Sequence, residues 1–156
     1  MDSTSTMILS LIALIALSAF FSASETAYTS LNRVRVKNMA SAGNRRAEKV
    51  LKLAENYDKL LSGILVGNNI VNILSASLAT VLFVSFLGGR GVSVSTAVMT
   101  IVVLMFGEIA PKSIAKENPE KVALAVYPAL NLIVKALSPI SFLTGCSRAY
   151  SLATTS

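Results

Sequence analysis

The stretch LLSGILVGNNIVNILSASLATVLFVSFL, residues 60–87, decides the fold class of this chain. It contains no charged side chain, and about 20 consecutive apolar residues in an α-helix are enough to cross the hydrocarbon core of a bilayer. The stretch exceeds that length, so it predicts a membrane-spanning helix that crosses with some tilt. Its amide side chains all lie in its first half.

Two further apolar runs, residues 7–28 and 92–110, lie on either side of this stretch. The first is near the lower length limit for a span unless its helix continues through small polar residues to Tyr28, and we expect that continuation. With 53% apolar residues, 14% charged residues and a mean hydropathy of +0.65, the chain is too apolar for an ordinary soluble domain. We therefore predict an all-α membrane protein with three transmembrane helices per protomer.

Basic residues gather between the first two spans, in the segment 32–59. An excess of Lys and Arg places a loop on the cytoplasmic side. We therefore expect a multi-pass protein of the plasma membrane, with its N-terminus outside and its C-terminus in the cytoplasm. This orientation explains the net charge of +6, and we expect no nucleic acid as a partner. Apolar and charged residues alternate at helical spacing over 44–58, which predicts an amphipathic helix along the interface.

A second juxtamembrane helix is predicted over 119–143, with Asn118 as its N-cap and Pro119 in its first turn. If residues 122–137 crossed the bilayer, the span would be short, would contain a proline and a lysine, and would place the C-terminus outside. Several lysines precede this segment, which favours a helix lying along the cytoplasmic interface.

The first apolar run also has features of a secretory signal, because small residues follow it at 22–24. Its only preceding charge is Asp2, whereas a signal peptide starts with a basic region, so we expect a retained span. Residues 1–150 then form one transmembrane domain, and residues 151–156 form a polar tail.

Polar side chains share one face at the inner end of the first span. Residues three, four and seven apart lie on the same side of a helix, so one stripe contains Ser22, Glu25, Thr26 and Thr29. Ser24 lies off this stripe and joins it only if the helix unwinds locally. An intramembrane carboxylate is costly, so it normally faces a bundle interior or a wet cavity and marks an ion or substrate path.

A second stripe lies on the central span, where Asn68, Asn72 and Ser75 stack at helical spacing. Gly63 and Gly67 let another helix or an ion approach the backbone closely. Two polar stripes that face each other on neighbouring helices predict a pocket within the membrane.

The third span contributes the sequence GEIAPK at 107–112. In a helix, Pro111 has no N–H for the carbonyl four residues back, which is that of Gly107. We expect a kink that leaves this oxygen free beside the Glu108 carboxylate.

These groups offer only oxygen ligands, namely carboxylate, hydroxyl, amide and backbone carbonyl. The chain has no His and a single Cys, so it lacks the nitrogen and sulfur ligands that Zn²⁺ and Cu²⁺ favour. An oxygen set suits hard cations such as Mg²⁺, Ca²⁺ or Na⁺, and the spacing does not select one of them.

Structural explanations compete at each position. Ser and Thr in membrane helices commonly bond their own backbone, and asparagines also hold helices together. Glu25 can pair with Arg33 or Arg35, and Glu108 can pair with Lys112 one turn on. A serine nucleophile is a further alternative, but the chain has no His to act as its base, so we expect no enzyme.

Three motifs carry a family resemblance: FFSASETA at 20–27, GNNIVN at 67–72 and GEIAPK at 107–112. In order and spacing they resemble the transmembrane domain of the CorC and cyclin M (CNNM) magnesium transporters, the prokaryotic CorC members in particular. The resemblance covers nearly the whole chain. It implies a homodimer of three-span protomers with a belt of cytoplasmic juxtamembrane helices, and export of Mg²⁺ in exchange for Na⁺.

The resemblance also implies a ligand set, carried over motif by motif. For Mg²⁺ the implied ligands are Ser22, Ser24, Gly67, Asn68, Asn72 and Glu108, with Glu25 and Thr26 as candidates for the coupling ion. Family members usually continue into CBS modules that bind ATP and Mg²⁺ and into a C-terminal domain, and we expect neither within residues 1–156. The alternative function is a membrane anchor or cation sensor that signals to such domains without transport.

Overall fold

The computed structural model describes residues 3–134 and 136, which form helices and short connections with no strand among them. The elements in chain order are α1 (Ser3–Thr29), α2 (Arg33–Ser41), α3 (Arg45–Glu55), α4 (Tyr57–Leu87), the 3-10 turn η1 (Gly88–Arg90), α5 (Gly91–Val102), the π-helix η2 (Val103–Ile109) and α6 (Ala110–Glu117). A further helix covers 119–134. The all-α fold class is confirmed for these residues.

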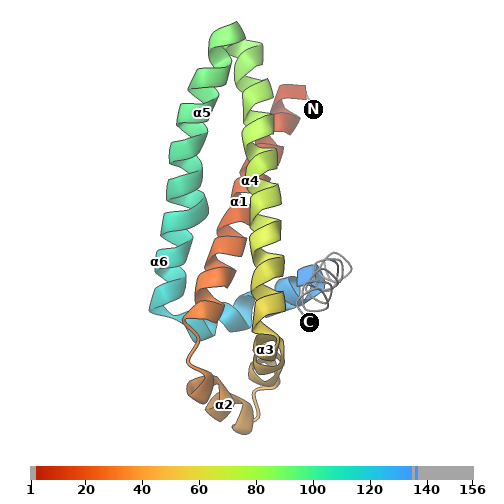
Figure 1. Ribbon diagram of the computed structural model, residues 1–156, viewed down its shortest axis with the longest axis vertical. Helices are drawn as coiled ribbons and strands as arrows, with labels where there is room; N and C mark the ends of the chain where they lie inside the picture. Colours follow the sequence, from red (N-terminus) through yellow and green to blue (C-terminus); the bar gives the residue numbers. More distant parts are fainter. Residues whose placement is uncertain (1–2, 135, 137–156) are drawn as a thin grey trace, which may run out of the picture.

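Three long helical rods run side by side (Figure 1). α4 leads away from the short connecting helices, the chain reverses at η1, and α5, η2 and α6 return alongside α1. Gly88 enters this reversal with a φ of 59°, a conformation that strains a residue with a Cβ. Two helical stretches are long and apolar enough to cross a membrane, Ser3–Thr29 and Tyr57–Glu117, and the second one contains the reversal. The division into three crossings stays a prediction.

The outer surface of the rods is rich in apolar side chains. Large hydrophobic residues stand exposed on all three rods, among them Ile12, Ile73, Phe86 and Ile101. Water-soluble monomers rarely expose apolar surface on this scale, whereas lipid tails solvate it without cost. The exposed side chains and the spanning stretches together indicate a membrane protein.

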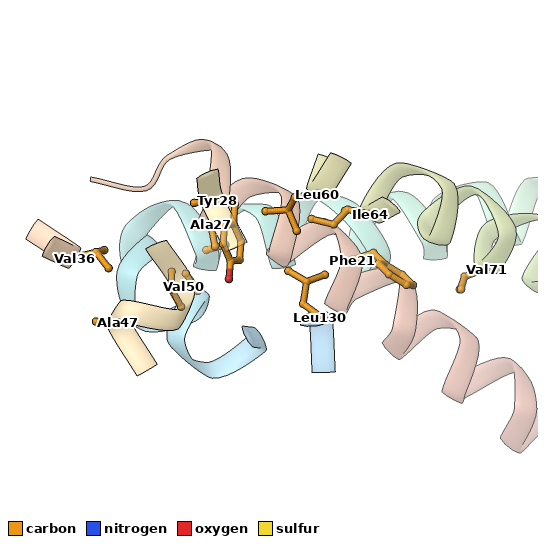
Figure 2. Packing of buried hydrophobic residues seen from close by; sticks show 13 residues of the cluster. Phe21, Ala27, Tyr28, Val36, Ala47, Val50, Leu60, Ile64, Val71 and Leu130 are labelled. Atoms are coloured by element: carbon orange, nitrogen blue, oxygen red, sulfur yellow. The ribbon is translucent and has the colours of Figure 1, made fainter. Parts of the chain in front are cut away.

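The best-packed core lies at the end of the rods that carries the short helices, and we call this the inner end. Tyr28, Val50, Leu60 and Leu130 are buried together there (Figure 2). Full burial of a leucine contributes roughly 1.5–3 kcal/mol, so Leu60 and Leu130 tie the helix at 119–134 firmly to α4. In Figure 1 this helix lies across the ends of the rods rather than beside them. That placement favours an interfacial helix over a further crossing.

Two asparagines start the connecting helices. The Asn32 side chain accepts a hydrogen bond from the backbone N–H of Arg35, and the Asn44 side chain accepts from those of Arg46 and Ala47. Caps of this kind contribute about 1 kcal/mol each. Helix α3 was expected after Asn44, whereas α2 lies outside the predicted elements, although the cap at Asn32 marks its start.

Element boundaries depart from the expected ones in two places. The helix predicted over 44–58 ends at Glu55, and Asn56 separates it from α4. The third rod continues to Glu117, because Pro111 lies in the first turn of α6, where a missing N–H is tolerated. Two predicted segments lie outside the described residues, namely 137–143 of the second juxtamembrane helix and the tail at 151–156.

Candidate cation site

A polar cluster lies where the three rods meet, near the middle of α1. Ser18 of α1 faces α4, and its hydroxyl lies 2.8 Å from Asn72 Oδ1 and 3.2 Å from Asn68 Oδ1. Gly107 of η2 closes the third side so tightly that a Cβ there would lie 2.9 Å from Ser18 Oγ. Ser18 itself is fully buried. We call Ser18, Asn68 and Asn72 the three-oxygen cluster.

The three-oxygen cluster is short of hydrogen-bond donors. Both amide oxygens point at one hydroxyl, and a serine hydroxyl has a single proton to donate. Two carbonyl dipoles whose negative ends face the same point repel each other unless positive charge lies between them. The arrangement is therefore better suited to a bound cation than to the single hydroxyl proton of Ser18.

Ser22 extends this face of α1 by one turn toward the inner side. Its side chain is fully buried, and its hydroxyl has no hydrogen-bond partner in the described part of the chain. A buried polar group left unpaired costs about 1–3 kcal/mol, so such a hydroxyl is normally satisfied by water or by an ion. Ser22 thus adds an unused oxygen beside the cluster.

The register of α1 against α4 is set by Phe21 and Gly67. A Cβ at Gly67 would lie 2.5 Å from Phe21 Cζ, so the aromatic ring occupies the space that the missing side chain leaves. Of the two roles predicted for Gly67, close approach of a helix is the one that the contact shows. Because α1 and α4 run in opposite directions, this contact brings Ser18 level with Asn68 and Asn72.

The segment that carries Glu108 is a π-helix rather than a simple proline kink. The N–H of Ala110 donates to the carbonyl of Met105, five residues back. The hydrogen-bond ladder has therefore shifted before Pro111, and the free carbonyl expected at Gly107 stays a prediction. Gly107 is buried against Ser18, and Glu108 follows it, partly buried.

Ser24 and Ser75 do not join the cluster. Helix α1 is continuous through Ser24, so the local unwinding that would bring this residue onto the stripe is not present. The Ser24 hydroxyl donates to the Phe20 carbonyl at 2.7 Å, and the Ser75 hydroxyl donates to the Val71 carbonyl at 2.8 Å. Both hydroxyls are used by their own helix, as expected for an isolated serine in a membrane helix.

Glu25 lies away from the cluster, at the inner ends of α1 and α6. Its carboxylate forms an ion pair with Lys112 Nζ at 3.3 Å. The two pairings expected as structural alternatives are therefore wrong: Arg35 pairs with Glu120 at 3.7 Å, and Lys112 is held by Glu25 instead of Glu108. The register of the returning third rod against α1, which the sequence does not show, brings Lys112 to Glu25.

A pocket of about 380 Å³ surrounds this ion pair. We call it the inner pocket, and its lining residues are Glu25, Thr26, Thr29, Ser30, Lys112, Ser113 and Lys116. The predicted polar stripe of α1 is thus divided. Ser22 belongs with the three-oxygen cluster, and the rest of the stripe lines the inner pocket.

Ser18 is the residue that sequence reasoning missed. It lies one turn before Ser22 on the same helix face, and this spacing is the only signal of its role. Within residues 3–134 and 136, no three His, Cys, Asp or Glu side chains gather as a metal cluster. A cation at the meeting point of the rods would therefore be held mainly by neutral oxygens.

Comparison with known proteins identifies the family. Residues 9–153 match the cyclin M transmembrane N-terminal domain. The chain belongs to this family. The recognition of the chain as a CorC and cyclin M type transmembrane domain is thereby confirmed.

Relatives of this cyclin M domain include bacterial proteins, one of them named as an inner membrane protein. The chain is 48% identical over 117 residues to the UPF0053 inner membrane protein YfjD of Escherichia coli, covering 75% of this chain and 27% of that protein. It is 41% identical over 139 residues to a UPF0053 protein of Haemophilus influenzae, covering 89% and 33%. A polyamine export protein of Haemophilus influenzae is 29% identical over 146 residues, covering 85% and 34%. The chain thus spans about a third or less of the length of these relatives.

Proposed function

We propose that this chain is the membrane domain of a magnesium exporter, in which Mg²⁺ passes between the three rods through the three-oxygen cluster. The observation that carries the proposal is the convergence of two amide oxygens on one hydroxyl, at 2.8 and 3.2 Å, inside a membrane domain. Membership of the cyclin M family supports it. The proposal assigns the chain no catalytic role.

Magnesium makes demands that this site meets in part. The ion needs compact octahedral coordination by oxygens at about 2.0–2.1 Å and gives up its water reluctantly. We propose the three-oxygen cluster, the unpartnered Ser22 hydroxyl and the Glu108 carboxylate as its protein ligands, with water in the remaining positions. Ser24 is no longer in this set, because its hydroxyl is used by α1. The backbone ligand at Gly67 stays a prediction.

Sodium coupling is the energetic part of the proposal. Moving a cation out against an inside-negative potential costs about 2.3 kcal/mol per elementary charge per 100 mV, so an ion that flows inward is needed to drive it. We propose Glu25 and Thr26 as the coupling site for Na⁺. Lys112 holds Glu25 in this conformation, so Na⁺ and the lysine compete for one carboxylate. Release of Lys112 would free α6 to move relative to α1.

Polyamine export is the second candidate function. A relative bears that name, and one contact in this chain favours the chemistry. The Glu25–Lys112 pair places an alkylammonium group on a carboxylate at the inner end of the rods, and the amino groups of a polyamine are also alkylammonium groups. A polyamine would displace Lys112 at that position. The apolar carbon chain between its amino groups would then need a route between the rods, which the neutral cluster alone does not offer.

A flux assay separates these functions. The purified chain is reconstituted in liposomes loaded with a magnesium dye, and Mg²⁺, Ca²⁺ or spermidine is offered with and without a sodium gradient. The magnesium proposal expects Mg²⁺ flux that follows the sodium gradient and is lost in Asn72→Ala. Spermidine flux without Mg²⁺ flux would establish the second candidate. Saturable Mg²⁺ binding with no flux of any cation would identify a sensor or anchor.

Orientation and assembly complete the proposal. We propose three crossings, with the N-terminus outside and the short helices α2 and α3 in the cytoplasm, because basic residues concentrate in the segment 32–59. We also propose a homodimer, on the strength of the family resemblance. Cysteine labelling from each side of the membrane tests the first statement, and mass measurement in detergent tests the second.

A further inference from the structure

The inner pocket has an excess of positive charge, which a path for cations does not explain. Its lining holds two lysines against one carboxylate. That carboxylate, Glu25, is already neutralised by Lys112 at 3.3 Å, so the ammonium group of Lys116 is left as the excess charge. A divalent cation in this pocket would meet net repulsion, whereas an anion would be attracted.

The pocket also offers hydroxyl donors. Thr29 is already engaged, since its hydroxyl donates to the Glu25 carbonyl and accepts from the Tyr57 hydroxyl. In the described part of the chain, the hydroxyls of Thr26, Ser30 and Ser113 make no hydrogen bond within the protein. Ser113 and Lys116 lie on α6, and Ser30 directly follows α1, so donors face the pocket from two elements.

The location of the pocket narrows the kind of anion. It lies at the end of the rods that carries α2, α3 and the helix at 119–134, next to the basic connecting segment. By the distribution of Lys and Arg this end meets the headgroups of the inner leaflet. Basic pockets between membrane helices on this side bind phosphate-bearing headgroups, and a lysine is a common point-charge ligand of phosphate.

We propose that the inner pocket binds a phosphate group, held by Lys116 and by the hydroxyls of Ser113 and Ser30, while Lys112 remains on Glu25. The group belongs either to an anionic phospholipid of the inner leaflet or to free phosphate, because both present the same oxygens. Occupation would tie the inner end of α1 to α6. The phosphate group shares this pocket with the sodium site proposed at Glu25 and Thr26, but it lies apart from the three-oxygen cluster proposed for Mg²⁺. Its test measures anion binding and does not depend on magnesium transport.

The test compares two lysine variants with the same change in charge. The full chain is purified in detergent and incubated with equal amounts of phosphatidylglycerol and phosphatidylcholine, and the retained lipid is counted by native mass spectrometry. Lys116→Gln should lower the retention of phosphatidylglycerol about fivefold, the effect of one lysine near an anionic headgroup. Lys121→Gln is the control, because Lys121 is exposed on the neighbouring helix and does not line the pocket. It should retain the lipid like the unmodified chain.

Two further measurements decide the source of the phosphate. Inorganic phosphate is added to each protein, and broadening of its phosphorus resonance reports binding. Selective retention of phosphatidylglycerol establishes the lipid source, and broadening by the unmodified chain but not by Lys116→Gln, without lipid selectivity, establishes free phosphate. Ser113→Ala, which keeps every charge, should weaken the same binding by a smaller factor. The proposal is overturned if Lys116→Gln and Lys121→Gln behave alike in both assays.

Discussion

The three-oxygen cluster and the inner pocket both use α1, but the cluster pairs it with α4 and the inner pocket pairs it with α6, and the two sites differ in charge. The cluster is neutral, fully buried at Ser18 and short of donors. The inner pocket contains an ion pair whose partners are 29% and 41% exposed at Glu25 and Lys112. The cluster lacks positive charge, whereas the partly exposed inner pocket holds an ion pair and one further lysine.

The proposed crossing of the bilayer accounts for this difference, because it places the cluster near the centre and the inner pocket near the headgroups. A formal charge at the centre of a span is costly, so oriented amide and hydroxyl dipoles are the cheaper way to attract a cation there. Near the headgroups, water and lipid phosphate screen charge, and a carboxylate with a lysine is tolerated. Substitutions in the cluster should therefore change the affinity for a cation. Substitutions in the inner pocket should change how the free energy of unfolding depends on salt.

The largest effect is expected at Asn72. Asn72→Leu keeps the branched shape of the side chain and removes the amide oxygen that lies 2.8 Å from Ser18 Oγ. Affinity for Mg²⁺ should fall at least about 100-fold, which corresponds to roughly 2.8 kcal/mol of binding free energy. Asn69→Leu is the matched control, since Asn69 lies on the exposed side of α4. Calorimetry on both variants measures the difference, and equal affinities would assign the asparagines to helix packing alone.

Gly107→Ala should have the next largest effect. The new Cβ would lie 2.9 Å from Ser18 Oγ, and overpacking of this kind costs about 1–3 kcal/mol. If Ser18 rotates away instead, the three-oxygen cluster loses its hydroxyl and Mg²⁺ affinity falls. Gly63→Ala is the control within a helix, because its nearest contact is an ordinary 3.7 Å to Val134. That variant should gain up to about 1 kcal/mol from helix propensity. Thermal unfolding of both, followed by Mg²⁺ titration, tests the pair.

The contrast between the two sites also shows what the sequence could predict. The long apolar runs correctly indicated helices long enough to span a membrane, and their polar interruptions indicated where polar side chains gather. Asn44 marked the start of α3, because a cap is a local interaction between neighbouring residues. These features depend on residues close together in the chain, which is why the sequence reports them.

Features that depend on register between rods were not predicted. The stripe that begins at Ser22 was expected to face the stripe on the central span, but the contact of Phe21 with Gly67 sets Ser18 opposite Asn68 and Asn72. A lone serine in an apolar helix gives no pattern of its own. The π-helix was not predicted for a related reason. A proline predicts a missing hydrogen-bond donor, but it does not predict the shift in backbone hydrogen bonds that precedes it here.

Ser22 and Ser24 should respond in opposite ways. Ser22→Ala removes a buried hydroxyl without a partner, so the free energy of unfolding of the cation-free protein should rise by about 1 kcal/mol while Mg²⁺ affinity falls. Ser24→Ala removes only a bond to its own helix, and both quantities should change little. Unfolding with and without Mg²⁺ measures both effects. An equal loss of affinity in the two variants would mean that α1 unwinds when the ion binds.

The smallest effect on stability is expected at Lys112. Lys112→Met breaks a partly exposed ion pair, so the free energy of unfolding should fall by no more than about 1 kcal/mol. This loss should shrink at high ionic strength, where screening has already weakened the pair in the unmodified chain. Mg²⁺ affinity should stay the same, because Lys112 lines the inner pocket and not the cluster.

Sodium provides the sharper readout on the same variant. With Lys112 removed, the Glu25 carboxylate has lost its internal cation, so NaCl should stabilise Lys112→Met more than choline chloride does at equal ionic strength. Glu25→Gln breaks the same ion pair without leaving a free carboxylate, and there the two salts should act alike. If NaCl and choline chloride were also equivalent for Lys112→Met, Glu25 would not be a sodium ligand, and the coupling site would have to lie nearer the three-oxygen cluster.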